Sequence, residues 1–99
     1  MEKSMEMMEH KLKQIASRIH ELRLISGLSV ADMAARTGMS ESEYEACENG
    51  DRNLSIALLY HCVLAFGVDM SDILEGKSPK LRSYSLTRKG TYPFLWFSN

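Results

Sequence analysis

The sequence predicts a small all-α domain of five helices. Its 99 residues leave room for one hydrophobic core, and its 44% hydrophobic and 25% charged residues are typical of a globular domain. Apolar residues recur at intervals of three and four, which is helical spacing. Serines precede several of these runs and glycines follow them, as is common at the two ends of helices. Five such runs with short connections indicate a helical domain.

The longest apolar run begins near the N-terminus and predicts a helix over residues 4–26. Its apolar positions follow one another at intervals of three and four, namely Met5, Met8, Leu12, Ile15, Ile19 and Leu22. The second half can supply the first helix of a core, whereas residues 1–14 are an N-terminal extension of that helix. Met5 and Met8 therefore either cover the end of the same core or pair with another chain. We favour the core, because a coiled coil needs about three or four heptads.

The second expected helix covers residues 30–37. Ser29 offers a side-chain oxygen to its N-terminus, and Asp32 stands three residues later, where a capping box has its acidic partner. Met33 and Ala34 form its inward face. The small alanine lets another helix approach closely.

The third expected helix follows after a turn of three residues. Gly38 breaks the second helix, Ser40 caps the third, and Glu43 occupies the capping-box position. The third helix ends at Glu48, because an Asn-Gly pair follows it. The sequence therefore predicts two short helices joined by a tight turn.

Two further helices complete the expected domain. Ser55 caps the fourth helix, and Gly67 ends it. Its apolar residues recur at helical spacing and are Leu58, Leu59, Cys62, Ala65 and Phe66. A short fifth helix turns Ile73 and Leu74 inward and is closed by Gly76.

No arrangement of reactive side chains indicates an enzyme. His10, His20 and His61 are scattered over helices without a carboxylate or cysteine partner at ligand spacing, and solvated helix faces account for them. Cys47 and Cys62 fall on apolar helix faces, so we expect small core residues rather than a disulfide or a metal pair. The sequence contains no glycine-rich phosphate loop and no nucleophile motif. We expect no catalysis, no cofactor and no metal.

The sequence gives no indication of a membrane protein. No apolar run approaches the roughly 20 residues that span a bilayer. The N-terminus is rich in Met, Glu and Lys and lacks the pattern of a secretion signal. We therefore expect a cytoplasmic protein without a membrane partner.

The charges are distributed unevenly along the chain. Residues 1–76 contain all 13 acidic residues but only seven of the 12 basic ones, whereas residues 77–99 contain five basic residues and no acidic one. Lys and Arg supply most of the non-specific affinity for nucleic acid, because they neutralise phosphates. The acidic body therefore weighs against nucleic-acid binding.

Residues 77–99 differ in composition from the helical body. They begin with a basic linker, residues 81–88 resemble a short strand, and the end is strongly apolar. A single strand cannot stand alone, so it must pair with a second chain, lie on the helices or stay disordered. The apolar tail is suited to an interface because of its large side chains, Tyr92, Phe94, Leu95, Trp96 and Phe97.

The segment from Leu28 to Gly50, L-S-V-A-D-M-A-A-R-T-G-M-S-E-S-E-Y-E-A-C-E-N-G, resembles the helix-turn-helix of the phage-repressor/Cro (XRE) family. Further marks are the R-x-H-E-L-R-x-x-x-G-L-S stretch before it and the A-F-G-V-D-M-S-D-I-L stretch after it. The resemblance covers residues 15–76. It implies an all-α, five-helix, lambda-repressor-like DNA-binding domain with an extended first helix and a short C-terminal strand-like tail.

The resemblance also implies which residues contact DNA. They lie in the second helix, the third helix and the loop that follows, at Val30, Arg36, Ser40, Glu41, Ser42, Glu43, Ala46, Asn49, Arg52 and Asn53. A structural salt bridge between Arg23 and Glu48 would orient the first helix on the third. The third helix would then offer its outer face to a major groove about 12 Å wide.

Several of these positions depart from the family pattern. Relatives commonly carry Gln, Arg, Ser or Thr where this chain has Val30, Glu41, Glu43, Glu45 and Ala46. Carboxylates can accept a hydrogen bond from cytosine N4, but they repel phosphates. Helix capping and the helix dipole account for Glu41 and Glu43. Glu45 has no such explanation.

The stretch K-S-P-K-L-R-S-Y-S-L-T-R-K-G that opens residues 77–99 is similar to the junction in regulators whose helix-turn-helix precedes a ligand-sensing cupin barrel. The remaining residues are too few for a cupin. We interpret the segment as a basic linker and apolar tail, a remnant of such a protein. We expect no small-molecule sensor domain within this chain.

Two functions remain open from the sequence. One is a sequence-specific transcriptional regulator that binds double-stranded DNA as a homodimer, with its two third helices in major grooves about 34 Å apart. Arg36, Arg52 and the basic tail would then hold phosphates, while hydroxyl and amide side chains would bond to backbone or base edges. The alternative is a protein-interaction module on the same fold that has lost DNA binding because of its acidic third helix.

Overall fold

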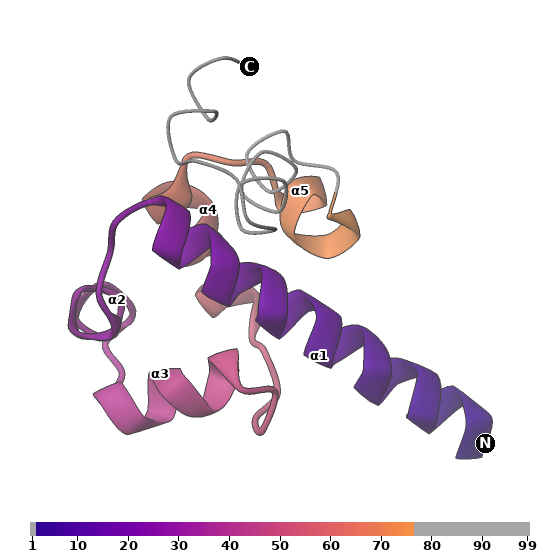
Figure 1. The fold of residues 1–99 in the computed structure, drawn as a ribbon. Helices are drawn as coiled ribbons and strands as arrows, with labels where there is room; N and C mark the ends of the chain where they lie inside the picture. The colour runs from indigo at the N-terminus through magenta and orange to yellow at the C-terminus, as the bar shows by residue number, and fades with distance from the viewer. Residues whose placement is uncertain (1, 77–99) are drawn as a thin grey trace, which may run out of the picture.

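The computed structural model describes residues 2–76 of the chain. Within this range there are five α-helices and no strand (Figure 1). In chain order these are α1 (Glu2–Ile25), α2 (Val30–Thr37), α3 (Glu41–Glu48), α4 (Ile56–Phe66) and α5 (Met70–Glu75). The predicted all-α class and the five helices are confirmed. The strand-like segment 81–88 and the apolar tail lie outside the described residues.

The N-termini of α2 and α3 are fixed by the capping boxes that the sequence predicts. The Ser29 hydroxyl accepts the Asp32 backbone N–H at 3.0 Å, and the Asp32 carboxylate accepts the Ser29 N–H at 2.9 Å. Ser40 and Glu43 repeat the arrangement at 3.1 and 3.0 Å. Gly38 ends α2 with φ of 72°, a left-handed conformation that favours glycine. These local contacts fix the turn between the two helices.

The core lies between the second half of α1 and the other four helices. α1 contacts α3, α4 and α5, while α2 packs on α3 and α4. The core cluster of the domain consists of the buried residues Ile15, Ile19, Leu22, Met33, Ala34, Tyr44, Cys47, Leu58, Leu59, Cys62, Phe66 and Ile73. α1 therefore packs against three of the other helices, and it extends across the molecule in Figure 1.

The first half of α1 does not cover the core. Met5 is 64% exposed and Met8 is 66% exposed, so the preferred interpretation of these two residues is wrong. The helix rises about 1.5 Å per residue. Because α1 is much longer than any of the other four helices, its first turns extend beyond them. Its N-terminal end stands away from α2–α5 in Figure 1. Burial begins near Leu12 and is complete at Ile15.

The short helix α5 is attached to α1 through a charged side chain. The Arg18 guanidinium donates to the carbonyl oxygens of Ile73 at 3.1 Å and Leu74 at 2.7 Å. These carbonyls lie at the end of a helix, where no further turn can bond them. Ile73 is buried and Leu74 is half-buried. The Arg18 side chain of α1 therefore caps the C-terminal end of α5.

The two cysteines are core residues, as predicted. Cys47 and Cys62 are free thiols, and both are buried. Burial raises the pKa of Cys47, and it raises the pKa of Cys62 to about 12. Both therefore remain protonated and unreactive at neutral pH.

Candidate nucleic-acid interface

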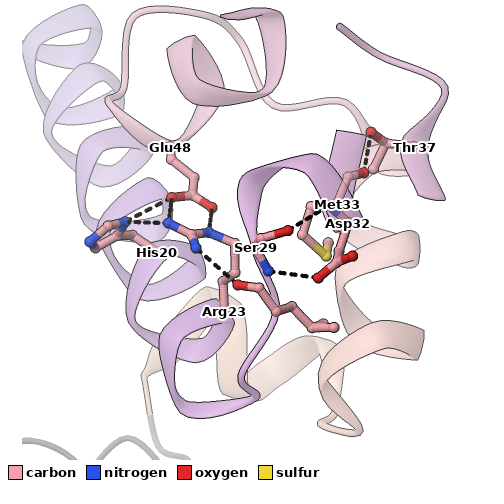
Figure 2. Close-up of polar contacts among 8 residues, drawn as sticks. His20, Arg23, Ser29, Asp32, Met33, Thr37 and Glu48 are labelled. Carbon is pink, nitrogen blue, oxygen red and sulfur yellow. Dashed lines mark hydrogen bonds and ion pairs between the residues drawn. The ribbon is translucent and has the colours of Figure 1, made fainter. Parts of the chain in front are cut away.

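The inner side of α3 is tied to α1 by an ion pair. Arg23 Nε lies 2.7 Å from Glu48 Oε2, and Arg23 Nη2 donates to Glu48 Oε1 at 3.2 Å (Figure 2). Arg23 Nη1 also donates to the carbonyl oxygen of Leu28, at 3.0 Å. Both charged side chains are almost completely buried. One guanidinium thus joins α1, the α1–α2 connection and the end of α3.

His20 is a third member of this cluster. Its Nδ1 lies 2.7 Å from Glu48 Oε1. Since a carboxylate only accepts, Nδ1 must carry the proton of this hydrogen bond. The 3.4 Å contact between Nδ1 and Arg23 Nη2 is therefore a donor facing a donor rather than a second bond. His20 lies on an exposed helix face, as predicted, but its carboxylate partner stands 28 residues away in the sequence, so no short spacing indicated this contact.

Glu48 is ionised despite its burial. Burial by itself raises the pKa of this carboxyl, but the hydrogen bonds from Arg23 and His20 outweigh it, and the pKa lies below its ordinary value. The Tyr44 hydroxyl is near enough for its own pKa to be raised, by burial first and by Glu48 second. That hydroxyl has no partner in hydrogen-bonding geometry within the described chain. We therefore assign the lowered pKa of Glu48 to the hydrogen bonds that Arg23 and His20 donate and to the charge of Arg23.

The outer side of α3 faces solvent. Most of the residues implied in DNA contact are exposed, namely Arg36, Ser40, Glu41, Ser42, Glu43, Asn49, Arg52 and Asn53. Val30 and Ala46 are half-buried, and Val30 packs against the core. The fold therefore brings side chains from the end of α2, from α3 and from the following loop to the surface around one exposed helix face.

Two of these residues are bound to each other. Arg52 Nη1 donates to Glu43 Oε2 at 3.2 Å, and both side chains are about half exposed. The Ser40 backbone N–H and the Arg52 guanidinium lower the pKa of Glu43, so the carboxylate is charged at neutral pH. Arg52 is thus partly neutralised within the protein before any phosphate approaches it.

The arrangement of α2, the three-residue turn and α3 matches a known family. Residues 14–78, about two thirds of the chain, match the model of a family described as a helix-turn-helix domain, of the Cro/C1 (XRE-like) type. The chain belongs to this family. Helix-turn-helix domains of this kind are associated with DNA binding and transcriptional regulation and are typically non-enzymatic. A comparison with curated proteins finds no match.

The helix-turn-helix borders a groove that the sequence did not reveal. The groove has a volume of about 330 Å³ between α1 and the loop after α3, and it is lined by Glu9, Leu12, Lys13, Gly50, Asp51, Arg52 and Asn53. Lys13 crosses Gly50 so closely that a Cβ there would lie 2.9 Å from Lys13 Cγ. Lys13 comes from outside the matched motif. No pattern of neighbouring residues in the sequence could have shown that Lys13 and Arg52 line the same groove.

The helix-turn-helix carries an unfavourable charge for a nucleic-acid interface. Residues 29–53 contain six acidic and two basic side chains. The charge of Glu48 is compensated by Arg23 inside the fold. The Glu43 carboxylate accepts hydrogen bonds from the Ser40 backbone N–H and from Arg52. Glu41 and Glu45 remain exposed on the outer side of α3. The outer face therefore presents carboxylates beside a few neutral polar groups.

The described part of the chain offers no metal site and no membrane span. Among these residues, no three His, Cys, Asp or Glu side chains gather as a metal ion requires. No helix within residues 2–76 is both long enough and apolar enough to cross a bilayer.

Proposed function

We propose that the chain is a sequence-specific DNA-binding transcriptional regulator that acts as a homodimer on double-stranded DNA. The observation that supports this most is the exposed outer face of α3, on a helix whose inner face is locked to α1 through Arg23 and Glu48. A rigid helix with one free face is what a major groove about 12 Å wide accommodates. The proposed function involves no catalysis and no cofactor.

Phosphate contacts in this proposal come from basic side chains that surround α3. Arg36 lies at the end of α2, whereas Lys13 and Arg52 line the groove beside α3. Such contacts fix the orientation of the protein on the duplex without reading its sequence. Arg52 must exchange Glu43 for a phosphate when DNA binds.

In this proposal, side chains on the outer side of α3 contact the edges of the DNA bases. The Ser40 and Ser42 hydroxyls are both exposed and lie 3.3 Å apart, and the Ser40 hydroxyl also accepts the backbone N–H of Glu43. The Glu41 and Glu45 carboxylates can only accept hydrogen bonds, and the base edge that donates in the major groove without a neighbouring acceptor is cytosine N4. We therefore expect an operator with cytosines at the positions that face α3.

The test is binding of the full chain to a randomised duplex pool, followed by fluorescence anisotropy on the enriched sequences at low and moderate salt. We expect a palindromic, cytosine-containing site whose affinity falls steeply as salt rises. Failure to bind any duplex at low salt would overturn the proposal.

Paired variants separate the two kinds of contact. Arg52→Ala and Lys13→Ala should weaken binding to a similar extent on all sequences and reduce the salt dependence. Ser42→Ala should instead change the preferred sequence. Uniform effects from all three variants would contradict this division.

A second candidate function is a protein-interaction module on the same fold. The excess of acidic side chains over residues 29–53 favours it, because carboxylates repel a phosphate backbone. Absence of duplex binding, together with capture of a basic peptide that Glu41→Gln and Glu45→Gln abolish, would establish this alternative.

A further inference from the structure

The outward face of α4 carries large apolar side chains that the core does not use. The helix buries Leu58, Leu59, Cys62 and Phe66 on its inner side. On its outer side Ile56 is 77% exposed, Tyr60 is 57% exposed and Leu64 is 61% exposed. These three residues are spaced by four, so they form one ridge along the helix, which we call the α4 ridge. The apolar periodicity of the sequence indicates only the inner set.

The α4 ridge is uncharged in an otherwise acidic body. None of the eleven residues of α4 is Asp, Glu, Lys or Arg. Residues 1–76 as a whole contain 13 acidic and seven basic residues, so the helical bodies of two copies carry net charge of the same sign. A face without charge is where two such copies can approach, and it offers a nucleic acid nothing to bind.

The α4 ridge also has the symmetry of a self-association surface. In a two-fold dimer the same patch meets itself, so residue i contacts residue j and j contacts i. An axis that passes beside Tyr60 brings the two Tyr60 side chains together. It also places Ile56 of each copy against Leu64 of the other, because both lie four residues from Tyr60. Ridges of this spacing pack with the helices crossing at about −50°.

The size of the α4 ridge fits a weak dimer. Three side chains with these exposures present on the order of 300 Å² of apolar surface per copy. A standard stable interface buries about 800 Å² per partner. The ridge can therefore form the centre of a small interface, at the weak end of specific protein–protein contacts. Two DNA half-sites would strengthen it by holding the copies together.

We propose that the α4 ridge, formed by Ile56, Tyr60 and Leu64, is the homodimer surface of this protein and that a second copy covers it with antiparallel α4 helices. The inference deepens the dimeric part of the proposed function. It is tested without DNA, so failure to dimerise and failure to bind DNA are separate results.

The first test is sedimentation of the full chain over a wide range of concentrations. We expect a monomer–dimer equilibrium that Tyr60→Glu weakens at least tenfold, because two carboxylates would meet at the two-fold axis. Met8→Glu is the matched control, since it places the same charge on another exposed apolar position of a helix. Circular dichroism checks folding, and Tyr60→Ser is the milder variant if Tyr60→Glu unfolds.

The second test is cross-linking by oxidised glutathione. The native Cys47 and Cys62 are buried and stay out of the reaction, so an introduced cysteine reports alone. Tyr60→Cys should give a disulfide-linked dimer. A mixture of Ile56→Cys and Leu64→Cys chains should cross-link more than either variant by itself.

Three outcomes would overturn the proposal. A chain that stays monomeric at every concentration leaves the α4 ridge to another occupant, such as residues 91–99 of the same chain. Dissociation by Met8→Glu with a persistent dimer in Tyr60→Glu moves the interface to the first half of α1. Equal cross-linking of the mixed and single variants removes the antiparallel arrangement.

Discussion

The two sides of α3 carry the same residue type with opposite consequences. On the inner side Glu48 is buried, held by Arg23 and His20, and joins α3 to α1. On the outer side Glu41 and Glu45 are exposed beside the surface that we propose for DNA. A carboxylate inside the fold therefore stabilises the domain, whereas the same group outside opposes a phosphate backbone. The count of acidic residues alone does not distinguish these roles.

The largest expected effect concerns the inner side. Glu48→Ala leaves the Arg23 guanidinium buried without its partner, so we expect the free energy of unfolding to fall by about 3 to 5 kcal/mol. Glu45→Ala on the outer side is the control, with an expected change within about 0.5 kcal/mol. Urea denaturation followed by circular dichroism measures both. Similar losses from the two variants would contradict the comparison.

Glu48 should also give the domain a defined dependence on acid. Its pKa is lower in the folded state than the ordinary glutamate value of 4.5, so the folded state stabilises the charged form. That stabilisation is fully present above the ordinary pKa and is lost as pH falls through the folded pKa. Urea midpoints from neutral pH to about pH 3 should therefore decline more for the natural chain than for Glu48→Gln. Parallel profiles would show that Glu48 is not the responsible group.

Tyr44→Phe tests the remaining polar group beside Glu48. Because the hydroxyl is buried without a partner, we expect its removal to raise the free energy of unfolding by up to about 1 kcal/mol. The measurement is again urea denaturation. A loss of more than about 1 kcal/mol would mean that the hydroxyl bonds to Glu48 in solution.

The smallest effect concerns the outer side. Glu43→Gln keeps an oxygen for the capping box but releases Arg52, so we expect affinity for DNA to rise roughly threefold. Anisotropy titrations on one duplex measure it, and Glu6→Gln on the exposed half of α1 controls for the general loss of negative charge. No difference between the two variants would show that the Glu43–Arg52 pair does not compete with phosphate.

The helix boundaries and the inner faces were predictable because their causes are local. The capping boxes at Ser29 and Ser40 lie within three residues of their partners, and Gly38 acts on its own turn. The inward positions Met33 and Ala34 follow from a helical period within one segment. The outer faces were less predictable, since periodicity identifies apolar stripes without showing what covers them. Met5 and Met8 were assigned to the core for that reason and are exposed.

The sequence alone determined the class of the fold, the five helices and the candidate helix-turn-helix, because short-range hydrogen bonds and apolar spacing encode them. Only the tertiary structure decided which polar groups meet. His20 reaches Glu48 across 28 residues, and Arg18 caps the carbonyls of α5 across 55. Lys13 comes to lie over Gly50 and beside Arg52 in the same way. These meetings depend on how α1 crosses the other helices, and no spacing within one segment records that crossing.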